Sequence, residues 1–183
     1  PTGDALRAAR GAEEIQVQDA LDMAAAGMDA EAICKKLEET GLDSTIYITV
    51  DTLKYLKKGG RITPAAAALG TLLRLKPVLT IQGEKLDAFA KARTMKQARS
   101  MMITAITRDL ENRFDDMTGE KTYIDVAHTD NDEMAQELAA ELRELFPETE
   151  VRVEPLSLSV ACHIGPGALA IAATKKLEIG SLL

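Results

Sequence analysis

The stretch KTYIDVAHTDNDEMAQELAAELRELF, residues 121–146, together with EVRVEPLS, residues 150–157, decides the fold class. The first nine residues have the composition of a strand, and EVRVEPLS has the composition of a second one. Between them, Asp130 and Glu133 are spaced as a capping box at the start of a helix. This helix has one apolar face, formed by Met134, Leu138, Leu142 and Leu145. The order strand, helix, strand predicts an α/β fold.

The N-terminal part of the chain also predicts alternating helices and strands. Residues 17–39 have a helical pattern with a break at Gly27, and Asp29 suits the N-cap of a second helix. Residues 44–53, STIYITVDTL, alternate β-branched and polar residues and therefore predict a strand. Residues 53–62 predict a short helix that ends at two adjacent glycines.

The middle of the chain predicts a helix, a hairpin and a long helix. Thr63 and Pro64 are residue types of an N-cap and a first helical position. Residues 76–81 and 83–93 predict two strands joined by a tight turn at Gly83. Beyond them, apolar residues at spacings of three and four predict one continuous helix face: Met95, Ala98, Met102, Ile106, Leu110 and Phe114.

Composition excludes several classes of protein. The 183 residues are 46% hydrophobic and 28% charged, which is a globular composition. Cys34 and Cys162 fit no metal site or disulfide framework, so we expect two buried, reduced thiols in a cytoplasmic protein. No apolar run approaches ~20 residues, which argues against membrane insertion.

His128 is expected at a strand end, and the acids around it lack the paired spacing of a metal site. The absence of Walker, G-x-G-x-x-G and G-x-S-x-G motifs predicts no cofactor, no bound nucleotide and no catalytic nucleophile.

The net charge of −7 conceals a strong asymmetry along the chain. Residues 52–108 carry twelve Lys and Arg against two acids, and residues 109–154 carry fifteen acids against four bases. In one interpretation these charges lie on solvated helix faces and mix in the folded molecule. In the other, the basic segment faces an anionic ligand or an acidic partner. Nucleic acid is not expected, because the whole chain is acidic and aromatic residues for stacking are scarce.

Two short segments carry residues that could bind an anionic group. In KKGGRIT, residues 57–63, two glycines precede Arg61, whose planar guanidinium suits a carboxylate or phosphate. The alternative is a plain helix end with a solvent-facing arginine. In SVACHIGPGALAIAA, residues 159–173, we expect a strand that ends near Cys162 and a helix that starts at Pro166. The free N–H groups of that helix would form an anion site beside His163.

The residues around this second segment leave alternatives open. The glycines on either side of Pro166 keep side chains away from the site, and the small residues behind them leave room for close packing or a slender apolar ligand. Lys175 and Lys176 suit the end of the expected helix. In the alternative interpretation, His163 is a buried structural residue beside a tight turn. The methionines at 95, 101 and 102 either line an adaptable apolar wall or pack in the core.

Four segments in this order resemble the DegV family of bacterial fatty-acid-binding proteins. They are YITVDTLKYLKKGGRIT (47–63), LKPVLTIQGEKLDAFAKARTMKQA (75–98), AHTDND (127–132) and CHIGPGALAIA (162–172). The resemblance runs from about Gln18 to Lys176. It implies two α/β domains with a fatty acid between them, the acyl chain in an apolar tunnel and the carboxylate at a small polar cluster. It also implies a non-catalytic carrier that presents its acid to a separate fatty acid kinase, whose acyl-phosphate product enters phospholipid synthesis.

The resemblance also assigns roles to residues of this chain. His163 is expected to contact the carboxylate. Arg61 and Arg93 are expected to flank the site and to assist acyl-phosphate formation or kinase docking. Three glycines are expected to shape the ligand-binding loops: Gly60, Gly165 and Gly167.

The same resemblance predicts a domain boundary. Residues 1–76 are expected to be the remnant of an N-terminal domain with interdomain helices, and residues 77–183 a C-terminal α/β lipid-binding domain. The family's N-terminal T-D-S motif and its carboxylate-binding Ser/Thr positions do not occur at the start of this chain. We therefore expect the C-terminal part of a longer chain, and an exposed apolar wall that favours self-association as a homodimer. Two alternatives are a fragment that binds no lipid and a dihydroxyacetone-kinase-like domain in which His163 binds a small carbonyl compound.

Overall fold

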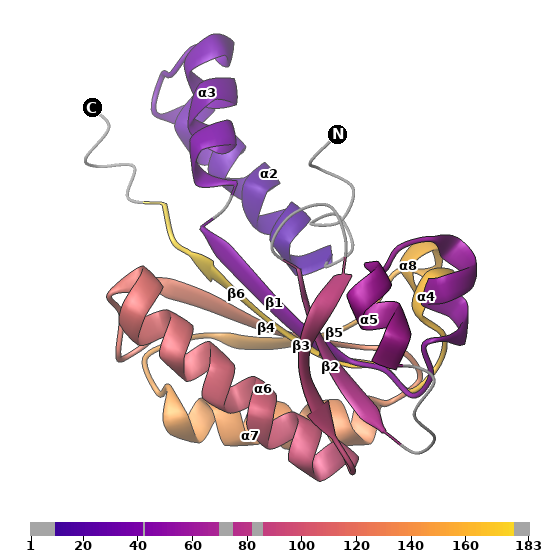
Figure 1. Cartoon of the computed structure of the whole chain (residues 1–183). Helices are drawn as coiled ribbons and strands as arrows, with labels where there is room; N and C mark the ends of the chain where they lie inside the picture. The colour runs from indigo at the N-terminus through magenta and orange to yellow at the C-terminus, as the bar shows by residue number, and fades with distance from the viewer. Residues whose placement is uncertain (1–9, 42, 70–74, 82–85, 178–183) are drawn as a thin grey trace.

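A six-stranded mixed sheet is the centre of the molecule (Figure 1), with the strand order β3-β2-β1-β6-β4-β5. The computed structural model describes residues 10–41, 43–69, 75–81 and 86–177. The strands are β1 (Ser44–Thr49), β2 (Lys76–Ile81), β3 (Leu86–Ala92), β4 (Thr122–His128), β5 (Val151–Pro155) and β6 (Leu169–Lys175). Neighbouring strands are antiparallel except β4 and β5, which are parallel and joined by a helix. The predicted α/β fold is thus confirmed.

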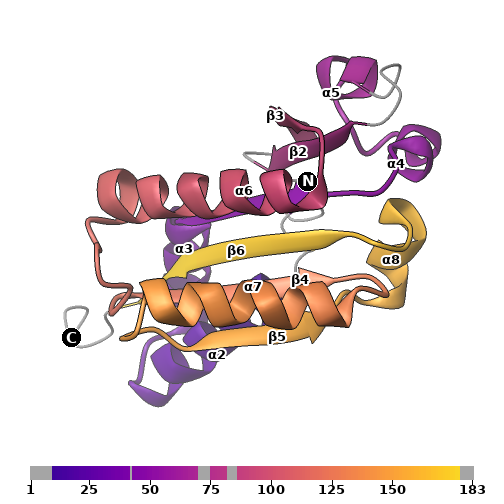
Figure 2. The same cartoon turned by 90° about the horizontal axis from the view of Figure 1, so that it is seen from below.

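The helices form two unequal layers. They are α2 (Arg10–Ala25), α3 (Ala30–Thr40), α4 (Lys54–Gly59), α5 (Pro64–Leu69), α6 (Met95–Asp109) with a π-helical extension η1 (Leu110–Phe114), α7 (Asp132–Leu145) and α8 (Leu158–Ile164). The long helices α6 and α7 lie side by side on one face of the sheet (Figure 2). The short helices α4, α5 and α8 gather at one end, and α2 and α3 extend away on the side opposite α6 and α7. None of the described helices combines the length and the apolar character needed to cross a membrane.

The larger hydrophobic cluster lies between the sheet and the pair α6–α7. The strands contribute alternate residues to it, for example Tyr47 from β1 and Ile171 from β6. The helices contribute their apolar faces, including Met102 and Ile106 of α6 and Leu138 of α7, all fully buried. The helix faces predicted from apolar spacing are therefore the faces that pack, except at Leu145, the last residue of α7, which is 50% exposed.

A second cluster lies on the other face of the sheet. The intervening strand residues supply it, with Ile46 and Ile48 from β1 and the small residues Ala170 and Ala172 from β6. Leu56 and other residues of α4, α5 and α8 cover it. The small residues after the Gly-Pro-Gly turn therefore belong to a central strand, and the expected helix at Pro166, with its anion site and with Lys175 at its end, is wrong. The strand expected to end near Cys162 is also wrong, because β5 ends at Pro155 and Cys162 lies in α8.

Three predicted helix starts are confirmed by their hydrogen bonds, and the start predicted at Asp130 is not. Asp29, Thr63 and Thr94 each accept a bond from a backbone N–H three residues later. The capping box of Asp130 and Glu133 is wrong, because the N-cap of α7 is the next residue, 131, and that places Glu133 one position too early. The backbone N–H of Asn131 instead donates to Nδ1 of His128 at 3.2 Å.

The predicted boundary after residue 76 stays a prediction. One sheet joins strands from both sides of it, because β1 pairs with β2 and with β6. The tight turn predicted at Gly83 lies outside the described residues, although the two strands that it would join do pair antiparallel.

Candidate functional site

The twin glycines end α4 and direct the chain to the edge strand. Gly60 adopts a left-handed φ of 65°, a conformation that glycine takes without steric cost. The next N–H, from Arg61, donates to the Leu56 carbonyl at 3.2 Å. The Arg61 carbonyl then accepts from the N–H of Leu86, the first residue of β3, also at 3.2 Å. The backbone of Arg61 is therefore fixed beside the start of β3.

The imidazole of His163 lies against this helix end. His163 is exposed in the last turn of α8, and α8 packs against α4. A Cβ atom placed on Gly59 would lie 3.1 Å from Nδ1 of His163 and 3.6 Å from Cγ of Arg61. The imidazole and the stem of Arg61 therefore both lie close to the position that a Gly59 side chain would occupy. These two candidates converge, and both are hydrogen-bond donors suited to an anion.

The Gly-Pro-Gly turn needs both of its glycines. Gly165 has φ 84°, and a Cβ there would lie only 2.4 Å from the Tyr55 ring of α4. Gly167 has φ 80°, and a Cβ there would lie 3.3 Å from the Cβ of Asp51, which follows β1. The turn therefore lies between α4 and the end of β1, and α8 reaches the sheet through it.

Thr129, directly after β4, holds the turn in place. Its hydroxyl donates to the Gly165 carbonyl at 2.6 Å and accepts from the Ala168 N–H at 3.0 Å. Its carbonyl accepts from the Gly167 N–H at 2.6 Å. Sequence reasoning did not single out Thr129 or Tyr55, and no local pattern marks them, because each acts on a turn far away in the chain.

Arg93 is separated from this cluster. It follows Ala92, the last residue of β3, whereas Arg61 is bonded to the first. A seven-residue strand spans about 20 Å. Arg93 is exposed, and its backbone N–H donates to Oε1 of Gln97 at 2.8 Å. His163 and Arg61 are therefore brought together, while Arg93 lies at the other end of the edge strand.

Several side-chain environments differ from expectation. His163 is exposed, so its alternative as a buried structural residue is wrong. Cys34 and Cys162 are exposed rather than buried, because each lies on the solvent side of an amphipathic helix. The basic and acidic segments do mix in part, since Arg99 of α6 bonds to Glu137 of α7 at 2.7 Å.

The edge strand also carries one acid with a shifted pKa. The Thr63 hydroxyl donates to Oδ1 of Asp87 at 2.6 Å, and the Ala88 N–H donates at 2.7 Å. These two bonds lower the pKa of this exposed carboxyl from its ordinary value. The bond from Thr63 also holds the segment after Arg61 against β3.

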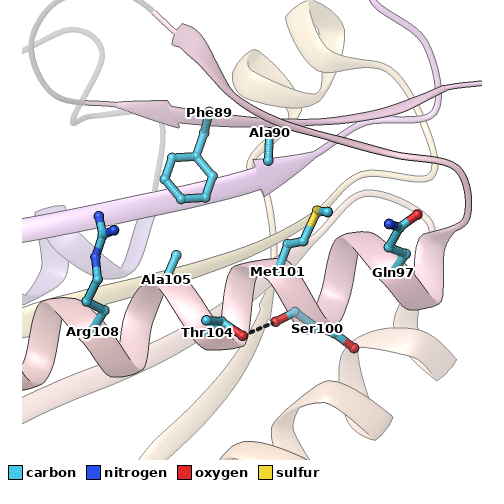
Figure 3. Close-up of a pocket in the computed structure, with 8 residues that line it drawn as sticks. All are labelled: Phe89, Ala90, Gln97, Ser100, Met101, Thr104, Ala105 and Arg108. Carbon is cyan, nitrogen blue, oxygen red and sulfur yellow. Dashed lines mark hydrogen bonds between the residues drawn. The ribbon is translucent and has the colours of Figure 1, made fainter.

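A mostly apolar cavity of about 310 Å³ lies on the other face of the sheet, between β3 and α6 (Figure 3). Its lining residues are Phe89, Ala90, Gln97, Ser100, Met101, Thr104, Ala105 and Arg108. Of the methionines considered from sequence, Met101 lines this cavity and Met102 is buried in the core. The cavity does not join the space between His163 and Arg61, whose elements pack into the second cluster.

Comparison with known proteins gives the same family from sequence and from structure. The family model described as "Uncharacterised protein, DegV family" matches residues 7–176. The DegV domain-containing protein YqaC of Lactococcus lactis is 38% identical over 163 residues, which cover 87% of this chain and 55% of that protein.

Solved structures agree with this match. The chain is similar, with a TM-score of 0.77 and 32% identity, to a structure from Thermus thermophilus described as "Fatty Acid Binding of a DegV family Protein". The alignment covers 88% of this chain and 56% of that one. A structure of DegV, a fatty acid binding protein from Bacillus subtilis, gives a TM-score of 0.72 and 30% identity over 86% of this chain and 54% of that one. The chain thus spans about half the length of the relatives it matches.

Proposed function

The chain belongs to the DegV family, and from that premise we propose that it binds a long-chain fatty acid, with its carboxylate at His163. The observation that carries this proposal is the meeting of the His163 ring and the Arg61 stem over Gly59. Two residues 102 positions apart in the chain, His163 and Arg61, approach the same helix end beside a hydrophobic cluster. An anionic head group on an apolar chain requires donors beside an apolar surface, and these two side chains would supply them.

Elementary energetics supports an acyl ligand. Each methylene removed from water stabilises the complex by ~0.8 kcal/mol, so a long chain supplies most of the affinity. A carboxylate removed from water without donors would be costly, and an imidazole and a guanidinium offset that cost. Gly60, Gly165 and Gly167 would serve the site by letting α4, α8 and the turn approach closely.

The exposure of His163 supports a carrier role rather than an enclosed catalytic site. We propose that a separate kinase phosphorylates the presented carboxylate in the cytoplasm, that the acyl phosphate enters phospholipid synthesis, and that Arg61 and Arg93 assist transfer or docking. The basic residues around α4 and β3 would favour an acidic partner surface. Val17 and Leu21 of α2, exposed at 60% and 58%, support the proposal that the isolated chain forms homodimers.

Native mass spectrometry of the purified 183-residue chain with added oleate tests the ligand. We expect a mass increment of one oleate, and a bare mass at saturating oleate would contradict the proposal. His163→Ala is expected to weaken oleate retention about ten- to a hundredfold, the loss of one hydrogen bond to a charged group. Arg61→Ala is expected mainly to lower acyl-phosphate formation in the presence of the kinase. A covalent adduct of His163 with dihydroxyacetone would instead support the enzyme alternative.

Gly59→Ala gives a sharper test of the role of His163. The new methyl group would stand 3.1 Å from Nδ1, so the ring must move, whereas alanine stabilises a helix relative to glycine. Oleate retention should fall while the free energy of unfolding stays the same or rises. Combined with His163→Ala, the substitution should have no further effect on binding. Additive losses in the double variant would show that Gly59→Ala does not act through His163.

A further inference from the structure

We call the open cavity between β3 and α6 the slot, and its lining residues run along one helix face. The α6 residues that line it run from Gln97 to Arg108 and recur at spacings of three and four, which places them on one face of the helix. These eleven steps of 1.5 Å make the slot about 16 Å long. Its volume of about 310 Å³ is at the lower end of small-molecule sites. A site that extends about 16 Å along one helix face suits a single alkyl chain better than a fused ring system.

The lining offers apolar contact and few hydrogen-bond donors. Phe89, whose ring centroid lies 4.7 Å from that of Tyr47, and Ala90 form the β3 side. Met101, half-buried and adaptable, lies opposite them on α6 (Figure 3). The hydroxyls of Ser100 and Thr104 donate to helix carbonyls at 3.2 and 2.9 Å, so their protons are already used.

One end of the slot carries a positive charge. Arg108 extends from α6 toward Phe89 (Figure 3), and its guanidinium makes no hydrogen bond or ion pair with any residue the structure describes. The neighbouring carboxylate does not neutralise it, because Asp109 is buried and accepts bonds at 2.7 Å from the hydroxyls of Thr45 and Tyr47. A guanidinium beside an apolar slot is complementary to a carboxylate on an alkyl chain.

We infer that this slot is a second ligand site, which takes a single-chain alkyl carboxylate with its chain along α6 and its head group on Arg108. The sheet separates it from His163, because Phe89 and Ala90 face α6 whereas α4 and α8 pack on the opposite face. The inference therefore does not depend on fatty-acid binding at His163. A ligand here would contact the molecule without reaching the His163 and Arg61 cluster.

Methyl NMR of the full chain labelled with ¹³C-methyl methionine tests the site, with sodium decanoate below its micellar concentration as the probe. We expect the Met101 methyl signal, assigned through Met101→Leu, to shift and saturate. Decyltrimethylammonium, with the same chain and the opposite charge, should bind at least about fivefold more weakly. No saturable shift of Met101 would overturn the inference, and so would equal binding of the two probes.

Variants separate the parts of the inference. Arg108→Gln should weaken decanoate binding about five- to tenfold, while Lys96→Gln, an equal charge change at an exposed α6 position outside the slot, should not. Met101→Trp should fill the slot and abolish the saturable shifts of the other methionines near it. Because that variant alters packing, Arg108→Gln at an exposed position is the decisive one. His163→Ala should leave decanoate binding at Met101 unchanged. Loss of binding in His163→Ala would overturn the claim of a separate site.

Discussion

The two faces of the sheet use the same strands but are covered in different ways. On one face, α6 and α7, of 15 and 14 residues, bury continuous apolar stripes against large strand side chains. On the other, α4, α5 and α8 have six or seven residues each, and the residues that β6 contributes to the cluster are alanines. Helices that short are not stable alone, so caps, turns and tertiary contacts hold them.

The two faces contribute to different properties: the α6–α7 face contributes most to stability, and the α4–α8 face determines the geometry of the candidate ligand site. The α6–α7 face contains the larger cluster, and Arg99 bonds the two helices together through Glu137 and Glu141. The α4–α8 face contains the polar residues that meet at Gly59, and it leaves Leu158 of α8 80% exposed. A thinner cover with small residues allows close approach of backbone and ligand, at the cost of buried apolar area.

Truncation of one buried leucine on each face should give the largest effect and test this comparison directly. Leu138 of α7 and Leu56 of α4 are 0% and 1% exposed. Leu138→Ala should lower the free energy of unfolding by about 3–5 kcal/mol, because long packed helices relax little into the cavity. Leu56→Ala should cost about 2–3 kcal/mol, since a six-residue helix can shift to fill the space.

Urea unfolding followed by circular dichroism measures both variants. Leu158→Ala is the matched control, and its 80% exposure predicts a change within about 0.5 kcal/mol. An equal or larger loss for Leu56→Ala would show that the two faces contribute alike.

The α6–α7 face was predictable from sequence because its signals are local. Apolar spacing identified the packed faces of both helices, and Thr94 identified the start of α6. The π-helical end of α6 was not predicted. Its residue Arg113 reaches Asp109 at 3.4 Å, while Asp109 bonds to β1, 64 and 62 residues away. Such long-range hydrogen bonds leave no pattern in neighbouring residues.

The α4–α8 face was predictable only in part. The twin glycines predict the end of α4, but the helix start predicted at Pro166 is wrong, because Gly165 and Gly167 both have positive φ and form a turn into β6. The error arose because Pro after Gly suits either structure, and the packing of Tyr55 on Gly165 decides between them. The meeting of His163 with Arg61 followed from family resemblance, not from any spacing.

Substitution of the turn glycine should have the second-largest effect. Gly165→Ala adds a Cβ at a φ of 84° and within 2.4 Å of the Tyr55 ring, so backbone strain and a clash act together. We expect a loss of about 2–3 kcal/mol and a displaced α8. Gly60→Ala, at φ 65° with no atom within 4 Å of the new Cβ, should cost only about 1 kcal/mol. Equal losses in urea unfolding would mean that the Tyr55 contact contributes nothing.

Alkaline pH should have the smallest effect, and it acts on the α6–α7 face. Burial of Tyr47 raises the pKa of its hydroxyl, and the hydrogen bond to Asp109 raises it further. In the unfolded chain this hydroxyl ionises near pH 10, whereas the folded protein keeps the proton to a higher pH. The stability that this group contributes is therefore fully present below about pH 10 and is lost as the pH rises through the higher folded pKa.

Tyr47→Phe isolates this contribution from the lysines that titrate in the same range. Between pH 9 and pH 11, the wild-type chain should lose on the order of 1 kcal/mol more stability than Tyr47→Phe, as measured by urea unfolding at each pH. Tyr55→Phe, at a residue 38% exposed on the α4–α8 face, is the matched control for loss of a tyrosine hydroxyl. Identical slopes for wild type and Tyr47→Phe would show that the hydroxyl ionises alike in both states. The bond to Asp109 would then not favour the neutral form, and the buried polar network would not distinguish this face.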